Sequence, residues 1–250
     1  MTARIGRARL TGAKMDKPIA QNTCLPSSRK GLNYFPTPPW ATRALCERLA
    51  ARLPIVLSGL SVWEPACGAG YMARPLGEYF GKVHASDIVD HRASFSGQDL
   101  VTDFLLDWPG ALPEADFIIT NPPFNRAFDF IELALRRARL GVAMLVKVQF
   151  LEGITRYREL FSRRWPWLIL QFAERVPMCE GRVDPDATTN QAYIWVIWLK
   201  PEFRLRLDKV GPPSFEWIAP SRKRLERPGD YPAASIDAAP DTPMIKLMEG

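Results

Sequence analysis

Four consecutive residues have the clearest chemical potential in this sequence: Asn121, Pro122, Pro123 and Phe124. Two successive prolines donate no backbone hydrogen bonds and have fixed φ angles, so this stretch must leave a sheet with rigidly placed carbonyls. The Asn121 carboxamide oxygen and the Pro122 carbonyl then form a pair of acceptors suited to an NH2 group, and Phe124 offers a face for a planar ring. A rigid turn with an asparagine cap is the alternative, but the position after an apolar strand favours the chemical interpretation.

A second candidate segment is a glycine loop over residues 63–70, Trp-Glu-Pro-Ala-Cys-Gly-Ala-Gly, directly after an apolar run. Gly68 and Gly70 allow the backbone to approach a ligand closely, and a helix that starts after them offers free N–H groups. Ordinary tight turns also use glycine, and the third glycine of a dinucleotide fingerprint is missing, because Ala73 and Arg74 stand there. The segment alone leaves ligand binding and a plain turn equally open.

Two acidic residues are further candidates: Asp87 follows the second apolar run, and Asp103 follows a short polar stretch. An acidic side chain at the position of Asp87 accepts hydrogen bonds from ribose hydroxyls in nucleoside-binding α/β folds. A solvated aspartate that caps a turn is the alternative. Asp103 and Phe104 form a pair suited to an adenine amine and its ring, although a turn aspartate before a core phenylalanine is the simpler explanation.

These segments fall in the loops of a predicted α/β sheet. Short apolar runs alternate with helical stretches, and several runs are too apolar to face water on one side, which indicates a mostly parallel sheet. Ligands bind at the carboxyl ends of such strands, so the loops that follow them are the place for chemistry. The predicted strands are residues 60–63, 83–85, 117–120, 141–148, 167–172 and 193–199.

Two helices are expected beside these strands. Thr37 is a favourable N-cap, proline is tolerated in the first turn, and apolar residues recur at helical spacing from Ala41 to Leu49, which predicts a helix over residues 38–52. A second amphipathic stripe covers residues 127–138 and is surrounded by arginines.

The net charge of +6 and the isoelectric point near 9.3 raise the question of an acidic partner such as nucleic acid. Residues 1–30 hold seven basic residues against one acidic residue, which equals the whole surplus, so the rest of the chain is net neutral. We therefore predict a flexible basic arm over residues 1–30, a folded domain over residues 31–200 and a partly disordered, proline-rich extension over residues 201–250.

Several classes of protein are excluded by what the sequence lacks. No apolar run approaches the roughly 20 residues that span a bilayer, so we expect no membrane partner. The four cysteines form no CxxC pair and have no histidine at metal-ligand spacing, so we expect no metal. The basic N-terminal stretch lacks the apolar core of a secretory signal, and a cytoplasmic location is expected.

Taken in order, the motifs resemble the class I S-adenosylmethionine-dependent methyltransferases, and within them the N6-adenine DNA type. The resemblance extends from about Tyr34 to Leu199, and five motifs in order are far more specific than any one of them. They are residues 34–39 (Tyr-Phe-Pro-Thr-Pro-Pro) as the N-terminal cofactor motif, 64–70 as the glycine loop, Asp87 as the ribose acid, 103–104 as the adenine-amine motif and 121–124 as the catalytic Asn-Pro-Pro-aromatic tetrad. Residues 150–153, with Arg156, also resemble small phage- or prophage-type members, more loosely.

The resemblance implies a Rossmann-like, mostly parallel, seven-stranded sheet with helices on both faces, in a single domain that binds S-adenosylmethionine. It places Tyr34 and Thr37 near the methionine end of this cofactor, and Asp87 at its ribose. The other implied cofactor-binding residues are Glu64, Ala66, Gly68 and Gly70 around the amino acid and the sulfonium, Asp103 and Phe104 at the adenine, and Asn121.

The implied activity is methylation of the exocyclic N6 amine of adenine in DNA. A stacked base cannot reach such a site, so base flipping is expected, with Phe124 receiving the ring. Many members of the family carry tyrosine at this position, so any hydrogen bond from a phenol is lost here. No separate target-recognition domain is expected after Leu199, so we predict modest sequence specificity.

Other functions fit the same acceptor pair. Adenine in RNA and a glutamine side-chain amide in a protein both present a planar NH2 group, although the glutamine type usually has tyrosine at the position of Phe124 and a preceding helical domain. A non-catalytic nucleic-acid-binding module that kept the fold is a third alternative. The target sequence, the oligomeric state and a role in restriction-modification, phage defence evasion or regulation stay open.

Two further features are candidates for nucleic-acid contact. The loop over residues 175–191 is rich in Gly, Pro, Asp and Thr and is a candidate substrate-side loop or a plain connector. Basic side chains on the fold are candidates for phosphate contact or simply solvated charges. They are Arg126, Arg136, Arg137, Arg139, Lys147, Arg156, Arg158, Arg163 and Arg164.

Overall fold

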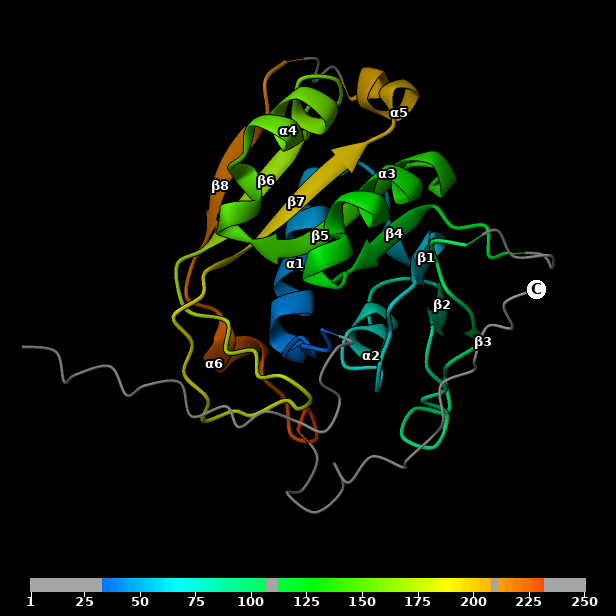
Figure 1. Cartoon of the computed structure of the whole chain (residues 1–250), viewed down its shortest axis with the longest axis vertical. Coiled ribbons are helices and arrows are strands. Elements are labelled where there is room, and N and C mark those ends of the chain that lie inside the picture. The colour runs from blue at the N-terminus through cyan, green and yellow to red at the C-terminus, as the bar shows by residue number, and fades with distance from the viewer. Residues whose placement is uncertain (1–32, 107–111, 208–210, 232–250) are drawn as a thin grey trace, which may run out of the picture.

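Eight strands form one sheet in the order β3-β2-β1-β4-β5-β7-β6-β8 in the computed structural model (Figure 1). The structure describes residues 33–106, 112–207 and 211–231. The predicted basic arm, residues 1–30, and the end of the predicted extension, residues 232–250, lie outside the described residues. The strands are β1 (Ser61–Glu64), β2 (Lys82–Asp87), β3 (Leu100–Val101), β4 (Phe117–Thr120), β5 (Gly141–Lys147), β6 (Leu168–Phe172), β7 (Tyr193–Leu199) and β8 (Ser214–Ile218).

Short helices connect the strands. The α-helices are α1 (Pro39–Arg52), α2 (Ala73–Leu76), α3 (Ala127–Arg137), α4 (Ile154–Arg156), α5 (Pro201–Arg206) and α6 (Arg222–Leu225). The 3-10 turns are η1 (Leu57–Gly59), η2 (Phe124–Arg126) and η3 (Val148–Leu151), and η4 (Tyr157–Phe161) is a π-helical turn. None of the helices among the described residues is both long enough and apolar enough to cross a bilayer.

The predicted mostly parallel α/β sheet is confirmed. Strands β1 to β5 pair in parallel, and β7 runs antiparallel between β5 and β6. The sheet has one strand more than the seven expected, because the edge strand β8 pairs in parallel with β6. In β8 the residues Ser-Phe-Glu-Trp alternate between half-buried and exposed, and the last residue, Ile218, is buried; the strand lies within the segment predicted to be an extension.

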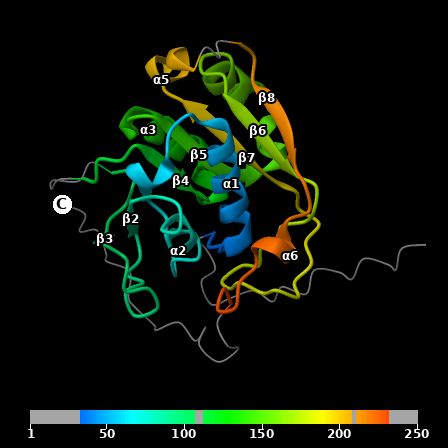
Figure 2. The same ribbon diagram turned by 180° about the vertical axis from the view of Figure 1, so that it is seen from behind.

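Alternating side chains of the central strands build two separate cores. In β7, Trp195 and Ile197 pack into the core on the face covered by α1 and α2, whereas Val196 and Trp198 pack into the core on the face covered by α3. Figures 1 and 2 show α3 and α1 on opposite faces of the sheet. Burial on both faces explains why β7 is apolar at every position.

Helix α1 begins without the predicted side-chain cap. Pro38 occupies the N-cap position, and the helix starts at Pro39. Proline is tolerated there because an N–H in the first turn of a helix has no hydrogen-bond partner within the helix. The Thr37 hydroxyl does not cap the helix but accepts a hydrogen bond from the Asn121 side chain (3.1 Å). The threonine that the sequence assigned to the helix start therefore belongs to the asparagine motif.

A buried arginine in α1 fastens residues 225–230 to the sheet domain. The Arg43 guanidinium is almost fully buried and makes two hydrogen bonds to Asp230 (2.7 and 2.8 Å). It also binds the Glu78 carboxylate (2.8 Å) and donates to the Leu225 carbonyl (2.7 Å). The planar guanidinium satisfies two carboxylates and one carbonyl at once, which a lysine ammonium at this position does not match in geometry.

The strand order creates the location for a site. From β1 the chain moves outward to β2 and β3, and it then returns to β4 on the other side of β1. In open α/β sheets the crevice at such a reversal, at the carboxyl ends of the strands, is where ligands bind. The glycine loop follows β1 and the Asn-Pro-Pro-Phe segment follows β4, so the topology brings the two motifs together.

Candidate functional site

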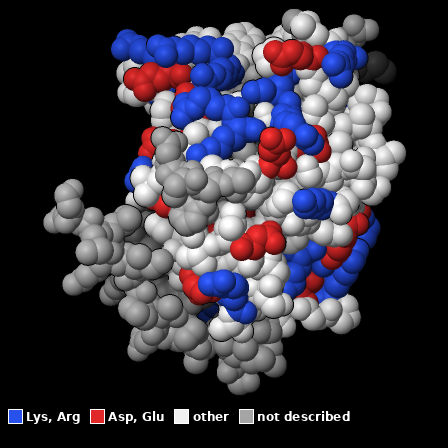
Figure 3. All heavy atoms as spheres, turned by 90° about the vertical axis from the view of Figure 1, so that its right-hand side faces the viewer, with Lys and Arg blue, Asp and Glu red and all other residues white. Residues whose placement is uncertain are grey.

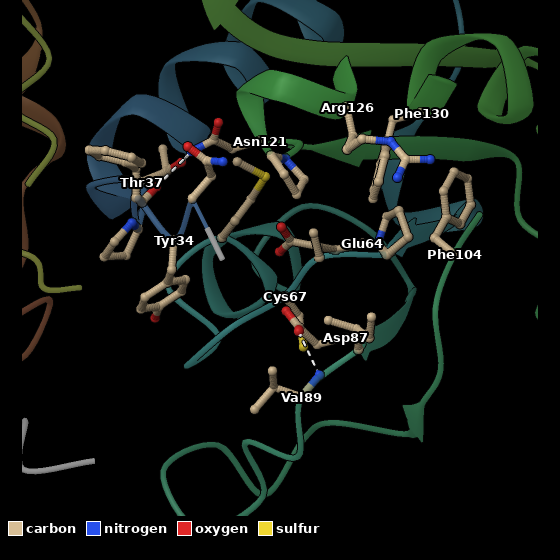
Figure 4. A pocket seen from close by; sticks show the side chains of 18 of the residues that line it. Tyr34, Thr37, Glu64, Cys67, Asp87, Val89, Phe104, Asn121, Arg126 and Phe130 are labelled. Atoms are coloured by element: carbon tan, nitrogen blue, oxygen red, sulfur yellow. Dashed lines mark hydrogen bonds between the residues drawn. The ribbon is translucent and has the colours of Figure 1, made fainter. Parts of the chain in front are cut away.

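A cleft opens at the carboxyl ends of β1, β2 and β4 (Figure 4). Eight of the residues assigned to cofactor binding line it: Tyr34, Thr37, Glu64, Ala66, Asp87, Asp103, Phe104 and Asn121. Four predicted site residues do not line the cleft: Gly68, Gly70, Pro122 and Phe124. Each of them is next in sequence to a residue that does. In Figure 4, Asn121 and Thr37 lie on one side of the cleft, Asp87 and Phe104 lie at its other borders, and Glu64 lies between them.

The Asn121 side chain is oriented by the segment that precedes α1. Its Nδ2 donates to the Phe35 carbonyl (2.7 Å) and to the Thr37 hydroxyl (3.1 Å). Because the Phe35 carbonyl can only accept, the amide nitrogen must face it, which fixes the position of Oδ1. Oδ1 is buried and has no hydrogen-bond partner among the described residues. The structure thus presents one oriented, unsatisfied acceptor at the carboxyl end of β4.

Residues 33–38, which we call the strap, also close over the glycine loop. The Tyr34 hydroxyl accepts a hydrogen bond from the Ala69 N–H (3.1 Å). The ring covers Gly68 so closely that a Cβ atom built there would lie 2.3 Å from Tyr34 Cε2. Gly68 also has a positive φ of 49°, a conformation that L-residues seldom adopt. The strap and the loop therefore require glycine at this position.

Asp87 holds the glycine loop against β2. Its Oδ2 accepts the Gly68 N–H (2.8 Å), and its Oδ1 accepts the Val89 N–H (3.0 Å). A carboxylate oxygen accepts more than one hydrogen bond, so ribose hydroxyls can share these oxygens. Asp87 is therefore placed both to shape the loop and to meet a ligand in the cleft.

Glu64 is a buried carboxyl at the end of β1, in the middle of the cleft wall. Its Oε1 lies 3.5 Å from the Thr120 hydroxyl, and its Oε2 has no hydrogen-bond partner among the described residues. Burial, together with the nearby negative charge of Asp87, raises the pKa of Glu64 well above its ordinary 4.5. A cation that entered the cleft would favour the ionised form of this carboxyl.

The Asp103–Phe104 pair forms the opposite wall. The Asp103 carboxylate accepts the Leu105 N–H (2.9 Å), the pattern of an aspartate that shapes its own turn. Phe104 is buried, and its ring centroid lies 5.2 Å from that of Trp63 and 5.0 Å from that of Phe130. Both residues line the cleft, so the turn fixes a carboxylate and an aromatic wall at one end of it.

Phe124 lies on the other side of the asparagine motif, in an aromatic group outside the cleft. Its centroid is 5.3 Å from that of Phe35 and 5.8 Å from that of Tyr193, and the Lys147 ammonium lies 4.5 Å from its centre. Tyr193 begins β7, directly opposite Lys147 at the end of β5. Sequence reasoning did not single out Tyr193, whose role depends on antiparallel pairing that no local pattern indicates.

The loop over residues 175–191 packs against the site. Met178 is buried, with its sulfur 3.6 Å from Asn121 Nδ2, and the Gly181 N–H donates to the Tyr34 carbonyl (2.8 Å). This loop therefore contacts both the strap and the asparagine. The position of His91, whose ring stacks on Tyr34 at 5.8 Å, was also not expected from the sequence.

The basic side chains differ in where they lie. Helices α3 and α5 carry Arg136, Arg137, Arg204 and Arg206 in their last turns. Figure 3 shows Lys and Arg gathered over the upper part of one face, on the side where α3 and α5 lie in Figure 1. Arg137 also donates to the Phe104 carbonyl (2.8 Å), so it supports the cleft wall from behind.

Two further observations concern metals and internal pairing. No group of three or more potential metal ligands occurs among the described residues.

Three of the nine basic residues that the sequence offered for phosphate contact form ion pairs within the fold: Arg126 with Asp129, Arg139 with Asp116 and Arg164 with Glu132. Their charge is thus partly offset within the fold.

Comparisons with known proteins identify the fold. No protein-family model and no curated protein matches the chain. A putative class I S-adenosylmethionine-dependent methyltransferase from Listeria monocytogenes aligns with a TM-score of 0.53 and 17% identity over 75% of this chain and 67% of that one. A putative RNA methyltransferase from Pyrococcus horikoshii gives a TM-score of 0.53 and 12% identity, over 72% of this chain and 94% of that one.

A type I restriction-modification methyltransferase subunit from Streptococcus thermophilus aligns with a TM-score of 0.51 and 14% identity, over 67% of this chain. The present chain spans 45% of the length of that subunit. Sequence identities this low establish the architecture alone. The protein therefore has the Rossmann-like fold of the class I S-adenosylmethionine-dependent methyltransferases.

Proposed function

We propose that this protein transfers a methyl group from S-adenosylmethionine to the exocyclic N6 amine of adenine in DNA. The observation that carries the proposal is the state of Asn121: its amide nitrogen is anchored, and its buried oxygen lacks a donor among the described residues. A buried acceptor without a partner costs free energy, on the order of 1–3 kcal/mol. A ligand NH2 group supplies the missing donor.

The cleft has the chemical features that S-adenosylmethionine requires. The unsatisfied Oε2 of Glu64 suits the positively charged amino group or sulfonium, and the carboxylate of Asp87 suits the ribose hydroxyls. Asp103 and the edge of Phe104 suit the adenine. When bound, the cofactor supplies a methyl group that its sulfonium has already activated. The protein's contribution is to place and polarise the acceptor.

Asn121 and Pro122 act on the amine. The lone pair of an exocyclic adenine nitrogen is delocalised into the ring, so this amine is a poor nucleophile. Acceptance of its two N–H bonds by Asn121 Oδ1 and the Pro122 carbonyl draws the nitrogen toward sp3 geometry and stabilises the positive charge that develops on it. No strong base is needed at the nitrogen before attack, because the cationic methylated amine formed by the transfer is acidic and releases its extra proton to solvent water afterwards.

Phe124 is the expected stacking surface for the ring that carries this amine. It follows the asparagine motif directly and lies among Phe35, Tyr193 and Lys147. A duplex base reaches this position only when it is rotated out of the stack, so the proposal includes base flipping. A phenylalanine provides the ring face without a hydroxyl.

The test measures transfer of tritiated methyl groups to duplex DNA, single-stranded DNA, total RNA and a glutamine-containing protein extract. We expect transfer to DNA, recovered as N6-methyladenine after hydrolysis. Asn121→Ala should lower kcat by about 100-fold or more. Cofactor affinity should fall by no more than about tenfold, because the substitution removes little beyond the Asn121 bonds to the strap.

Asn125→Ala is the matched control, because Asn125 also lines the cleft but is exposed and follows Pro122 by three residues. It should keep most of the activity. Unchanged turnover in Asn121→Ala would contradict the assignment of the acceptor, and methyl groups found only in RNA or only in protein would contradict the choice of DNA.

A further inference from the structure

A second cavity lies at the same edge of the sheet as Asn121, beyond the end of β6. Its volume is about 330 Å³, near the lower end of the range for small-molecule pockets. It is bordered by the last residues of β6, the start of β7 and Trp217 of β8. The lining residues that carry polar or aromatic groups are Gln171, Glu174, Arg175, Tyr193 and Trp217.

Trp217 gives this cavity an exposed flat wall. Its side chain is 64% exposed, which is unusual for the largest aromatic residue in a strand. The indole is steadied by an edge-to-face contact with Phe215 (4.8 Å between centroids). Base–aromatic stacking is the common use of such an exposed, fixed ring in proteins that bind single strands.

The polar groups around the indole suit a neutral heterocycle attached to a phosphate. Gln171 Nε2 donates to the Phe172 carbonyl (2.9 Å), and no donor among the described residues reaches its Oε1. Glu174 Oε1 is committed to the Ser221 and Arg222 N–H groups. Arg175 donates to the Asn190 carbonyl (3.2 Å) and has no carboxylate partner among the described residues.

One residue connects this cavity to the proposed target site. Tyr193 lines the cavity, and its ring centroid lies 5.8 Å from that of Phe124. Trp217 pairs in register with Gln171 near the carboxyl end of β6, so both walls reach the edge at which Asn121 follows β4. Tyr193 is thus common to the aromatic group around Phe124 and to the cavity, so the two sites are neighbours at this edge of the sheet.

We propose that the cavity between β6, β7 and β8 binds one unstacked base that flanks the target adenine on the same strand. The base stacks on Trp217, its edge meets the Gln171 carboxamide oxygen, and Arg175 meets the adjoining phosphate. This inference rests on the proposed function, since it assigns a second nucleotide subsite to the same nucleic-acid substrate. It also gives the chain a means of reading one base beside the target.

The test compares Trp217→Ala with Trp165→Ala, in the full-length protein. Trp165 is a matched control, because it is 51% exposed and does not line the cavity. Affinity for a fluorescein-labelled single-stranded oligonucleotide is measured by anisotropy, with deoxy and ribo versions as separate arms. Trp217→Ala should weaken binding by about 5- to 150-fold, the range for the loss of one stacked base. Trp165→Ala should change it less than twofold.

An abasic scan identifies the base. Removing the base that occupies the cavity should weaken binding to the wild type and leave binding to Trp217→Ala unchanged, whereas removing other bases should affect both proteins equally. Methyl transfer to the intact oligonucleotide is recorded in parallel. If the wild type methylates DNA but the two tryptophan variants bind it equally, the subsite is wrong and the proposed function stands.

Two other outcomes overturn the subsite. In the first, Trp217→Ala binds more weakly than the wild type, and the ratio of the two affinities is the same for every abasic oligonucleotide. Trp217 then contacts the backbone or another molecule instead of a base. A wild-type protein that neither binds nor methylates either nucleic acid overturns the proposed function and the subsite together. Melting temperatures of the two variants, both altered at exposed positions, verify that folding is intact.

Discussion

The Lys147 ammonium lies 4.5 Å from the centre of the Phe124 ring. Phe35 and Tyr193 pack near the same ring, at centroid distances of 5.3 and 5.8 Å. The surface on which a target base is expected to stack is therefore covered by a flexible, charged side chain. A cation–π contact at a partly exposed site is worth only about 0.5–1 kcal/mol, so a base can displace it.

The first prediction concerns where this ammonium goes when nucleic acid binds. We expect the Lys147 ammonium to leave the Phe124 ring and to form an ion pair with a phosphate of the bound strand, because the bound nucleic acid is a polyanion. Lys147→Met keeps the apolar stem and removes the charge. The slope of log K against log salt should become shallower by about one. Lys82→Met is the control, since Lys82 is exposed at the amino end of β2, and an equal slope for Lys147→Met and the wild type would contradict the exchange.

The second prediction concerns the pH dependence of cofactor binding. In the ligand-free protein, burial and Asp87 raise the pKa of Glu64 above 4.5, so the carboxyl stays protonated in a window above that value. A positively charged ligand favours the ionised form, so binding releases a proton and affinity should rise with pH across this window. Glu64→Gln cannot ionise and should bind more weakly, with no such pH dependence. Calorimetry in two buffers of different ionisation enthalpy measures the proton release.

The same carboxyl predicts an effect on stability. A carboxyl whose folded pKa is raised contributes stability that is complete below 4.5 and is lost as pH increases through the raised value. Ligand-free Glu64→Gln should therefore unfold at a higher temperature than the wild type near neutral pH and not at pH 4. Glu114→Gln, at a carboxyl that is 87% exposed, serves as the control. Equal stabilisation at both pH values would argue against a titrating Glu64.

The third prediction concerns Gly68. Alanine there must adopt a positive φ and place its Cβ 2.3 Å from Tyr34 Cε2. The φ strain alone costs about 1–2 kcal/mol, and displacement of the ring adds to it. Gly68→Ala should lower both the free energy of unfolding and the affinity for the cofactor.

A double-mutant cycle separates the two causes. In a Tyr34→Ala background the clash is absent, so Gly68→Ala should cost less and only the backbone strain should remain. Gly59→Ala is the matched control, because a Cβ at Gly59 meets nothing within 4 Å. Additive effects of the Gly68 and Tyr34 substitutions would contradict the close packing of the strap on the loop.

The fourth prediction concerns the buried Arg43. Removal of one partner from a buried ionic network leaves the other charges unpaired, which costs about 3–5 kcal/mol. Arg43→Met should lower the free energy of unfolding by this amount and increase proteolysis after Leu225, because Asp230 loses its anchor. Arg92→Met, at an exposed pair with Asp90, should leave the denaturant midpoint unchanged. Similar midpoints for both variants would contradict a role for the network.

The sequence predicts the central strands well because burial on both faces leaves a continuous apolar run. The ends of β4 and β7 agree with the prediction to the residue. Strands β3 and β8 were not predicted. Strand β3 has only two residues, and β8 lies in a proline-rich segment, so both form through pairing with a neighbouring strand and not through a local sequence pattern. The helix at α1 was predicted to within one residue, but its cap was wrong, because the Thr37 hydroxyl bonds Asn121 instead.

The candidate site was predictable in its motifs and not in its contacts. Asn121 and Glu64 stand directly after apolar runs, and Asp87 stands two residues after one, which is a signal that local sequence carries. The anchor of Asn121 comes from Phe35 and Thr37, more than eighty positions earlier in the chain. Met178 lies in a distant loop and Tyr193 in an antiparallel strand, so no spacing of residues in the sequence identifies them as neighbours of the site. Side-chain orientation depends on such long-range partners.

The strap over residues 33–38 bonds the glycine loop through the Tyr34 hydroxyl and the catalytic candidate Asn121 through the Phe35 carbonyl. A strap that lifts to let a ligand leave the cleft must break both hydrogen bonds in the same motion. The amide of Asn121 then loses the partner that fixes which of its atoms faces the amine. With S-adenosylmethionine in this cleft and adenine as the acceptor, as proposed above, the same short segment would couple occupancy of the cofactor cleft to the orientation of the amide that receives the amine.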